Sequence, residues 1–308
     1  VPEQPRPRAA LSRPMRRRPH QAIILAAGLA TRLRPLTAGQ PKATLPIWNR
    51  PALHHVLDLL VRWGVRDALI NLHHQPDAVF QAARRWTGPI RLAFSFEPLQ
   101  PLGTGGALRA AAWCLDAHPF WLVNADVMAD ADPAPLLAAL AGPGRPLAAL
   151  WMVPDAGPRT VAIQDGFVAD FAVPNPGTPG TATFSGVHLV RPELLRYLPD
   201  TPVSSIITAY RRAMADGRRI AGVTLPGAYW DDIGTFPEYR RAHAAILAAW
   251  RTGAPGGRLC DPGADRVHRA LRRRGVRVAG FAAVAPDAVI GRGARLQNCV
   301  IGAGAAVA

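Results

Sequence analysis

Apolar residues along the chain follow two alternating patterns: short continuous runs, which predict buried strands, and longer stretches with helical spacing. The first apolar run, residues 22–26, ends close to Gly28 and predicts a strand. Residues 51–63 then carry apolar side chains three and four positions apart and stop at Gly64, which predicts a helix. The same alternation predicts further strands at 67–72, 92–96 and 120–123 and further helices at 77–86 and 106–115.

This rhythm of strands and helices predicts an α/β fold with a doubly wound, mostly parallel sheet. Ligands of such sheets bind beyond the carboxyl ends of the strands. Gly28 and Asp126 each follow a predicted strand, so both are expected at that edge. The later part of the chain predicts strands at 148–153, 161–163, 183–190 and 220–225 and helices at 204–216 and 236–250.

Composition divides the chain into four expected regions. Residues 1–19 repeat Pro and Arg and predict a disordered basic tail, residues 20–250 predict the main domain, and the Gly- and Arg-rich residues 251–283 predict a linker. In residues 284–308 the run 289–294 is echoed by 300–305, an apolar-glycine repeat typical of a left-handed hexapeptide β-helix. Such a coil needs about three repeats to be stable alone. We therefore expect it to pack on the main domain or on another copy of the chain in a homo-oligomer, or to be cut short.

The net charge of +15 is concentrated near the two ends of the chain, in residues 6–18 and 266–277. The part between them is closer to balance and carries no zinc-finger or aromatic RNA-binding pattern, which disfavours a nucleic-acid partner. Three widely spaced cysteines argue against a disulfide framework and favour a reducing cytoplasm. No apolar run approaches the roughly 18 residues of a membrane span, so no membrane partner is expected. Arg16 to Arg18 before an apolar run would also suit a signal peptide, but the motif that follows favours a first strand.

The loop after the first strand carries the strongest chemical pattern in the chain. Small residues around Gly28 allow backbone N–H groups to approach a phosphate, and Arg32 and Lys42 follow at short range to neutralise it. Lys42 is the only lysine among 36 basic residues. The loop has neither the GxxxxGK[ST] nor the GxGxxG pattern, so it is not a Walker loop or a dinucleotide fingerprint.

The run LAAGLATRLRPLT at 25–37, followed by PK at 41–42, resembles the signature loop of the sugar-1-phosphate nucleotidyltransferases. Four more stretches resemble motifs of that family in the same order: PLGTGGAL at 101–108, NAD at 124–126, TFSGV at 183–187 and WDDIGT at 230–235. The resemblance covers residues 22 to about 248. Five motifs in the right order are far more specific than any one of them.

The resemblance implies an enzyme that transfers a nucleotidyl group from a nucleoside triphosphate (NTP) to a sugar 1-phosphate with the help of Mg²⁺. It implies that Arg32 and Lys42 are the catalytic residues: Arg32 holds the departing pyrophosphate, and Lys42 binds phosphate oxygens near the reacting centre. Asp126 and Asp232 would hold the metal, since the W-x-D register selects Asp232 over Asp231. Further implied contacts are to the nucleotide by Leu25, Ala26, Ala27, Gly28, Thr31, Gly103 and Thr104, and to the sugar by Asn124 and Gly186.

Two positions depart from the family pattern. Ala30 replaces the second glycine of GxGTR, which would be strained if that position has a positive φ. No lysine lies between Gln164 and Gly180, where many members carry one near the sugar phosphate. This absence favours the branches similar to mannose-1-phosphate guanylyltransferases, taken first, or N-acetylmuramate-1-phosphate uridylyltransferases. A non-catalytic, nucleotide-sensing relative is the alternative that Ala30 raises, although both aspartates and Lys42 are present.

Overall fold

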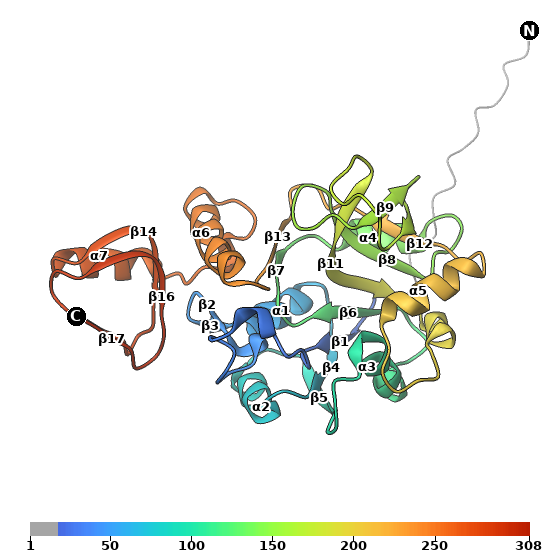
Figure 1. Cartoon of the computed structure of the whole chain (residues 1–308), viewed down its shortest axis with the longest axis horizontal. Helices are drawn as coiled ribbons and strands as arrows, with labels where there is room; N and C mark the ends of the chain where they lie inside the picture. Colours follow the sequence, from blue (N-terminus) through green and yellow to red (C-terminus); the bar gives the residue numbers. More distant parts are fainter. Residues whose placement is uncertain (1–17) are drawn as a thin grey trace, which may run out of the picture.

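The structure is a computed structural model that describes residues 18–308, so the tail expected at residues 1–19 lies almost wholly outside the described residues. Its centre is a nine-stranded sheet with the order β5-β4-β1-β6-β11-β8-β12-β10-β9 (Figure 1). The strands of this sheet are β1 (Gln21–Leu25), β4 (Asp67–Leu72), β5 (Arg91–Phe96), β6 (Phe120–Asn124), β8 (Ala148–Val153), β9 (Val161–Gln164), β10 (Phe167–Asp170), β11 (Thr181–Val190) and β12 (Ile220–Val223).

Helices cover both faces of the sheet, as expected for an α/β fold. Successive residues of β1 point to opposite faces: Ala22 and Ile24 join one buried cluster and Ile23 joins the other. The first cluster is completed by α1, α2 and α4, and the second by α3 and α5. These helices are α1 (Ala52–Arg62), α2 (Pro76–Arg85), α3 (Gly103–Ala111), α4 (Ala134–Ala141) and α5 (Ile206–Ala215).

The sheet is mixed, which corrects the expectation of a mostly parallel one. Strands β5, β4, β1 and β6 are parallel, but β11 runs antiparallel to both β6 and β8, and β10 antiparallel to β12 and β9. Parallel neighbours need a long crossover connection, usually a helix. No helix lies between β8 and β11 in the chain, only the hairpin β9–β10, so the chain returns in the opposite direction.

Beyond the sheet, short ladders and 3₁₀ turns complete the main domain. The ladder β7 (Val127–Asp130) with β13 (Tyr229–Asp232) is antiparallel, and it pairs Val127 with Asp232. Helix α6 (Phe236–Thr252) follows β13 directly. The remaining short elements are β2 (Pro46–Ile47), β3 (Arg50–Pro51), η1 (Thr31–Leu33), η2 (Lys42–Thr44), η3 (Ala112–Cys114), η4 (Pro192–Tyr197) and η5 (Gly257–Leu259).

The segment 251–283, expected to be a linker, instead contains helix α7 (Ala264–Arg273) and strand β14 (Arg277–Val284). The helix was hidden by its composition, because only Ala264, His268 and Leu271 are buried and they recur at helical spacing among arginines. Parallel pairs then form between β14 and β16 (Arg295–Ile301) and between β15 (Val289–Ile290) and β17 (Ala306–Val307). This C-terminal segment extends to one side of the sheet domain, next to α6 (Figure 1).

The C-terminal segment is fastened to the main domain by apolar and polar contacts. Phe281 of β14 packs in one buried cluster with Trp48 and with Ile246 of α6. The Asn49 side chain donates hydrogen bonds to Asp261 Oδ2 at 3.0 Å and to the Val284 carbonyl at 3.1 Å. The segment is therefore an extension of the main domain and not a separate body on a tether.

Candidate active site

The small-residue loop leaves the end of β1, which lies between the parallel strands β4 and β6. Its first residue is fixed, because the Ala26 N–H donates to Asn71 Oδ1 at 2.6 Å. Ala30, at the other end of the small-residue stretch, is held as well, because Thr37 Oγ1 donates to the Ala30 carbonyl at 2.8 Å. Between these anchors Gly28 has open space around its Cα, and η1 presents Thr31 and Arg32 to the same cavity.

Ala30, the residue that departs from the family pattern, has a left-handed backbone, with φ of 48° and ψ of 40°. A left-handed conformation costs an alanine roughly 1 kcal/mol more than a glycine. Residue 30 thus has the backbone conformation that favours glycine, and it has this conformation although an alanine stands there. The Thr37 hydrogen bond to this residue contributes to holding it there.

Lys42, Asp126 and Asp232 meet at one point in the fold. Lys42 Nζ donates to Asp232 Oδ1 at 3.1 Å and also forms an ion pair with Asp126 Oδ2. Asp126 precedes β7 and Asp232 ends β13, so the β7–β13 ladder is what brings the two carboxylates together. Burial lowers the pKa of Lys42, but the charges of the two aspartates outweigh it and raise that pKa overall.

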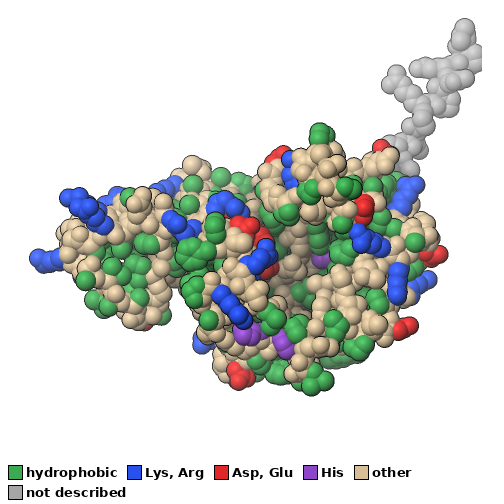
Figure 2. Space-filling model, viewed as in Figure 1, with side chains coloured by type: hydrophobic (Ala, Val, Ile, Leu, Met, Phe, Trp, Pro, Cys, Tyr) green, Lys and Arg blue, Asp and Glu red, His purple; other side chains and the backbone are tan. Residues whose placement is uncertain are grey.

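Two cavities join along the loop into one cleft. The first encloses about 450 Å³ and is lined by cationic side chains, Arg32 and Lys42, together with Asp126. The second encloses about 230 Å³ and is lined by Asn71, Glu97, Gly103, Thr104 and Asn124. Both share Leu25, Gly28, Pro101 and Asp126, so the cleft has a basic lobe and a neutral-to-acidic lobe. Figure 2 shows that this face of the molecule is hollowed at its centre, with acidic and basic side chains at the rim.

Gly234 lines the basic lobe and leaves a gap between three charged side chains, of which Arg32 also lines that lobe. A Cβ at this residue would lie 3.0 Å from Asp232 Oδ2, 3.1 Å from Arg32 Nη2 and 3.2 Å from Glu238 Oε2. Within the described part of the chain, that buried Glu238 oxygen has no hydrogen-bond partner. The absence of a side chain at residue 234 thus keeps the space between the carboxylates and the arginine open.

The predicted sugar contacts, Asn124 and Gly186, lie against each other at the boundary between β6 and β11. Gly186 has a φ of 83°, and a Cβ there would come within 2.6 Å of Asn124 Nδ2. Trp230 of β13 donates from its indole N–H to the Ser185 carbonyl at 3.0 Å. Three of the predicted motifs therefore converge on one side of the cleft.

The PLGTGGAL turn begins α3, and part of its hydrogen-bonding capacity is already used inside the fold. Thr104 Oγ1 accepts from the Ile206 N–H at 2.8 Å, and the N–H groups of Gly105 and Gly106 donate to the Ser204 carbonyl. Gly103 and Thr104 still line the second lobe. The turn thus joins α3 to the start of α5 as well as bordering the cleft.

Asn71 and Glu97 are site residues that the sequence analysis missed. Asn71 Nδ2 donates to Glu97 Oε1 at 2.8 Å, and the Leu102 N–H donates to Glu97 Oε2 at 2.8 Å. Both side chains are buried and line the second lobe. Each stands at the carboxyl end of a strand, β4 or β5, and a polar residue ending an apolar run was the signal that could have revealed them.

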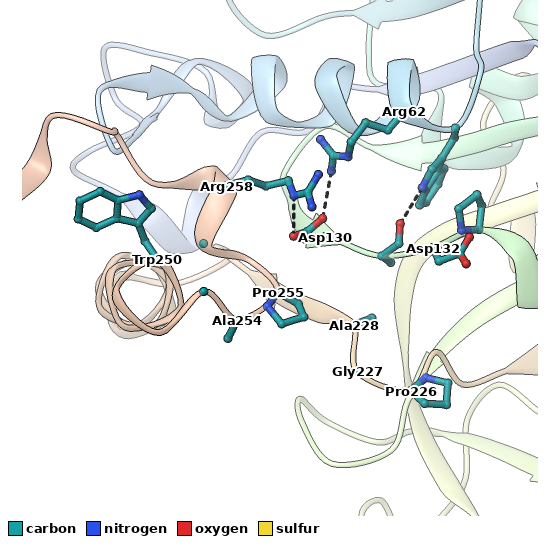
Figure 3. A pocket seen from close by; sticks show the side chains of 15 residues that line it. Arg62, Asp130, Asp132, Pro226, Gly227, Ala228, Trp250, Ala254, Pro255 and Arg258 are labelled. Atoms are coloured by element: carbon teal, nitrogen blue, oxygen red, sulfur yellow. Dashed lines mark hydrogen bonds and ion pairs between the residues drawn. The ribbon is translucent and has the colours of Figure 1, made fainter.

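A further cavity of about 680 Å³ lies at the opposite end of the β7–β13 ladder (Figure 3). Its main polar feature is Asp130, which accepts from Arg258 at 3.0 Å and from Arg62 at 3.4 Å. None of the residues predicted for the site lines it.

Across residues 18–308, no group of three or more His, Cys, Asp or Glu side chains is arranged to hold a metal by protein ligands alone. No helix in that range is long and apolar enough to cross a bilayer.

The fold and the cleft define a class of α/β protein whose cleft lies at the carboxyl ends of parallel strands, where ligands of such sheets bind. A family model described as nucleotidyl transferase matches residues 21–161. Among curated proteins, the chain is 32% identical over 253 residues to the N-acetylmuramate alpha-1-phosphate uridylyltransferase of Caulobacter vibrioides, covering 76% of this chain and 99% of that protein. It is 26% identical to the mannose-1-phosphate guanyltransferase of Schizosaccharomyces pombe, covering 79% of this chain and 72% of that protein.

Solved structures show the same fold at lower identity. HddC from Yersinia pseudotuberculosis superposes with a TM-score of 0.61 at 21% identity, over 74% of this chain and 99% of that one. A UDP-glucose pyrophosphorylase complexed with UDP-glucose gives a TM-score of 0.61 at 17% identity, over 75% and 99% of the two chains. The chain belongs to the nucleotidyl transferase family, which confirms the resemblance found in its motifs, and it is a nucleotidyltransferase enzyme.

Proposed function

We propose that this protein transfers a nucleotidyl group from an NTP to a sugar 1-phosphate and releases pyrophosphate, with Asp126 and Asp232 as ligands of Mg²⁺. The observation that carries the proposal is the meeting of these two carboxylates and Lys42 beside the small-residue loop. The donor set fits the metal, because Mg²⁺ in phosphate-transfer sites is held by one or two carboxylates, with the substrate phosphates and water completing its shell.

In this reaction a phosphate oxygen of the sugar 1-phosphate attacks the α-phosphorus, and the bond to the pyrophosphate oxygen breaks. Lys42 binds phosphate oxygens near the reacting centre, and Arg32 binds the departing pyrophosphate. The loop N–H groups around Gly28 orient the triphosphate in line for attack. Mg²⁺, when bound, polarises the phosphate oxygens and neutralises their charge. No residue forms a covalent bond to the substrate, so positioning and charge neutralisation provide the catalysis.

For the base we propose guanine. Glu97 lines the second lobe, and each of its oxygens already accepts one hydrogen bond, from Asn71 Nδ2 or from the Leu102 N–H. Each oxygen keeps a second acceptor site, and guanine presents two adjacent donor groups that could use them. The guanyltransferase relative supports this choice, with mannose 1-phosphate or a related hexose or heptose 1-phosphate as the acceptor. The second candidate is uridylyl transfer to N-acetylmuramate 1-phosphate, which the 32% identical relative favours.

We further infer that β14 to β17 are the first turns of a hexapeptide β-helix, through which two copies of the chain associate. The parallel pairs β14–β16 and β15–β17 support this proposal. Light scattering of the chain with and without residues 284–308 tests the association.

We also propose that the enzyme works in the cytoplasm. Its cysteines, Cys114, Cys260 and Cys299, are free thiols, which suits a reducing compartment.

A matrix of reactions tests the proposed function. Pyrophosphate release is measured for GTP, UTP, dTTP, CTP and ATP against a panel of sugar 1-phosphates with Mg²⁺. We expect turnover with GTP and a hexose or heptose 1-phosphate, while fastest turnover with UTP and N-acetylmuramate 1-phosphate would select the second candidate. An absence of turnover with every pair would refute the proposal.

Lys42→Ala and Asp126→Ala are each expected to lower turnover severely without unfolding the chain.

A further inference from the structure

Lys42 occupies an unusual position between the two carboxylates proposed to hold the metal. Its ammonium donates to Asp232 Oδ1 at 3.1 Å and contacts Asp126 Oδ2, so one cation already binds both oxygen donors. The side chain of Lys42 is 13% exposed, against 27% and 37% for those of Asp126 and Asp232, so the ammonium lies on the inner side of the pair.

We propose that Lys42 and a divalent cation compete for Asp126 and Asp232, and that the triphosphate ends this competition by giving the lysine ammonium other oxygens to bind. The inference rests on the proposed function, because it takes the two aspartates as cation ligands. It goes further by giving Lys42 a second role, as a counter-ion that suppresses cation binding until the nucleotide is bound.

Charge balance supports the competition. Two carboxylates and one ammonium leave one negative charge, whereas a divalent cation would neutralise both carboxylates. The lysine displaced by such a cation would then stand next to a dication without an anionic partner, in a place where water is partly excluded. Within residues 18–308, the acidic side chains that form ion pairs with Lys42 are Asp126 and Asp232.

The triphosphate supplies what the protein lacks. Lys42 and Arg32 line the same cavity of about 450 Å³, so phosphate oxygens placed there come within reach of a flexible lysine side chain. Once Lys42 binds phosphate, both aspartates are free for the cation. Cation and nucleotide therefore increase each other's affinity, as any two coupled ligands must.

The residue type fits this exchange. A lysine ammonium is a compact charge with three freely rotating donors on a flexible stem, and it can leave one pair of oxygens for another. An arginine would bind the two carboxylates with a rigid planar fork. Every other basic residue of this chain apart from the histidines is arginine, and the exception is at this place.

Binding of Mn²⁺ alone, followed by the electron paramagnetic resonance signal of the free ion, tests the proposal without any turnover. We expect Lys42→Met to bind Mn²⁺ roughly tenfold more tightly than the unmodified chain in the absence of nucleotide, a change within the usual range of coupling between sites. Equal or weaker Mn²⁺ binding by this variant would overturn the proposal. Arg251→Met, which frees the surface carboxylate of Asp265 from its partner at 2.8 Å, is the matched control and should leave Mn²⁺ binding unchanged.

Thermal melting gives an independent readout. In a chelator, Lys42→Met is expected to melt below the unmodified chain because the two carboxylates then repel each other, and adding Asp126→Asn to it should restore the melting temperature. Mn²⁺ should raise the melting temperature of Lys42→Met more than that of the unmodified chain, and an equal rise would count against the competition. Lys42→Gln serves as a second variant if Lys42→Met fails to fold.

The result also separates this inference from the proposed function. If adding Asp126→Asn or Asp232→Asn to Lys42→Met leaves Mn²⁺ binding unchanged, and the single variants bind Mn²⁺ with nucleotide as well as the unmodified chain does, the aspartates are not the cation ligands and the proposed metal site is wrong. If these two variants lose Mn²⁺ while Lys42→Met does not gain affinity, the metal site stands and only the competition is wrong.

Discussion

Ala30 lines the basic lobe and has a left-handed backbone conformation, with φ of 48°. Ala30→Gly is expected to raise the free energy of unfolding, by up to about 1 kcal/mol, because glycine adopts this conformation without the contact between Cβ and carbonyl oxygen. The gain is reduced by the greater freedom of glycine in the unfolded chain. Urea denaturation of the two proteins measures the difference.

Ala38→Gly is the matched control for this loop, since Ala38 is not among the residues with a positive φ in the described chain. It should lower the free energy of unfolding, because only the cost in the unfolded state remains. Equal effects of the two substitutions would show that the left-handed backbone of Ala30 is not strained.

Gly234→Ala is expected to lower kcat by about 100-fold, since its methyl group would enter the space between Asp232, Arg32 and Glu238 and displace them from their working positions. The backbone of residue 234 does not have a positive φ, so the fold should tolerate the change. Steady-state kinetics and urea denaturation together separate the two effects. Gly39→Ala, at a glycine with nothing within 4 Å of its Cβ position, should keep normal kinetics.

At the scale of elements, the β7–β13 ladder brings Asp126 and Asp232 together, and α6 begins shortly after Asp232 and Gly234. Thr235 caps α6, and its side-chain oxygen accepts from the Glu238 N–H at 3.4 Å. We expect Thr235→Ala to cost about 1 kcal/mol of stability and also to lower kcat, because the cap directly follows Asp232 and Gly234. Chemical denaturation and kinetics measure both.

Ser205 provides a matched cap away from the β7–β13 ladder. Its side-chain oxygen accepts from the Ile207 N–H at 3.2 Å at the start of α5. Ser205→Ala should cost a similar free energy and leave kcat closer to normal. If both variants lose kcat equally, the cap of α6 does not position the site.

The sequence predicted the elements that carry family motifs better than elements without a motif, such as α7. The loop at Gly28, Asn124, Asp126 and Asp232 were predicted from motifs that resemble those of the family, and the structure brings Asp126 and Asp232 together on Lys42 beside this loop. The meeting of Asp126 with Asp232 required the register of the β7–β13 ladder, which no local pattern contains. Helix α7 was missed because arginines outnumber the buried residues that mark its inner face.

The same limit explains the sheet. Local patterns identified its strands except β10, but the direction of β11 depends on which strand it joins, and that is decided by contacts distant in the chain. Glu97 and Asn71 were missed for a related reason: they line the cleft only because β4 and β5 lie next to β1 in the sheet. Sequence patterns thus revealed residue chemistry and local elements, while pairing across the sheet required the structure.

At the scale of the whole molecule, buried histidines make stability depend on pH. Burial lowers the pKa of His55 to about 4, that of His188 to about 3 and that of His243 to about 4. His243 must be neutral to accept from the Trp48 N–H at 3.3 Å while its other ring nitrogen donates to the Tyr239 carbonyl at 2.9 Å. At a pH well above 6.5, these three histidines are neutral in the folded and unfolded chain alike, and their contribution to stability is complete.

As the pH falls from about 6.5 towards 4, the unfolded chain binds protons that the folded chain excludes, so stability decreases. Near pH 5 His55, His188 and His243 are each expected to remove about 2 kcal/mol. Urea denaturation near pH 7 and near pH 5 measures the loss. It should be smaller in His243→Gln, and an equal loss in both proteins would contradict the assignment.

The distance in sequence between Lys42 and Asp232, 190 residues, determines when the site can exist during synthesis. A growing chain that has reached residue 161 already has the loop, Lys42 and Asp126, but β13 has not yet been made. Until residue 232 leaves the ribosome, Lys42 has Asp126 but not Asp232 as an ion-pair partner. A nascent or truncated chain that ends before β13 therefore lacks one of the two carboxylates proposed to hold the metal.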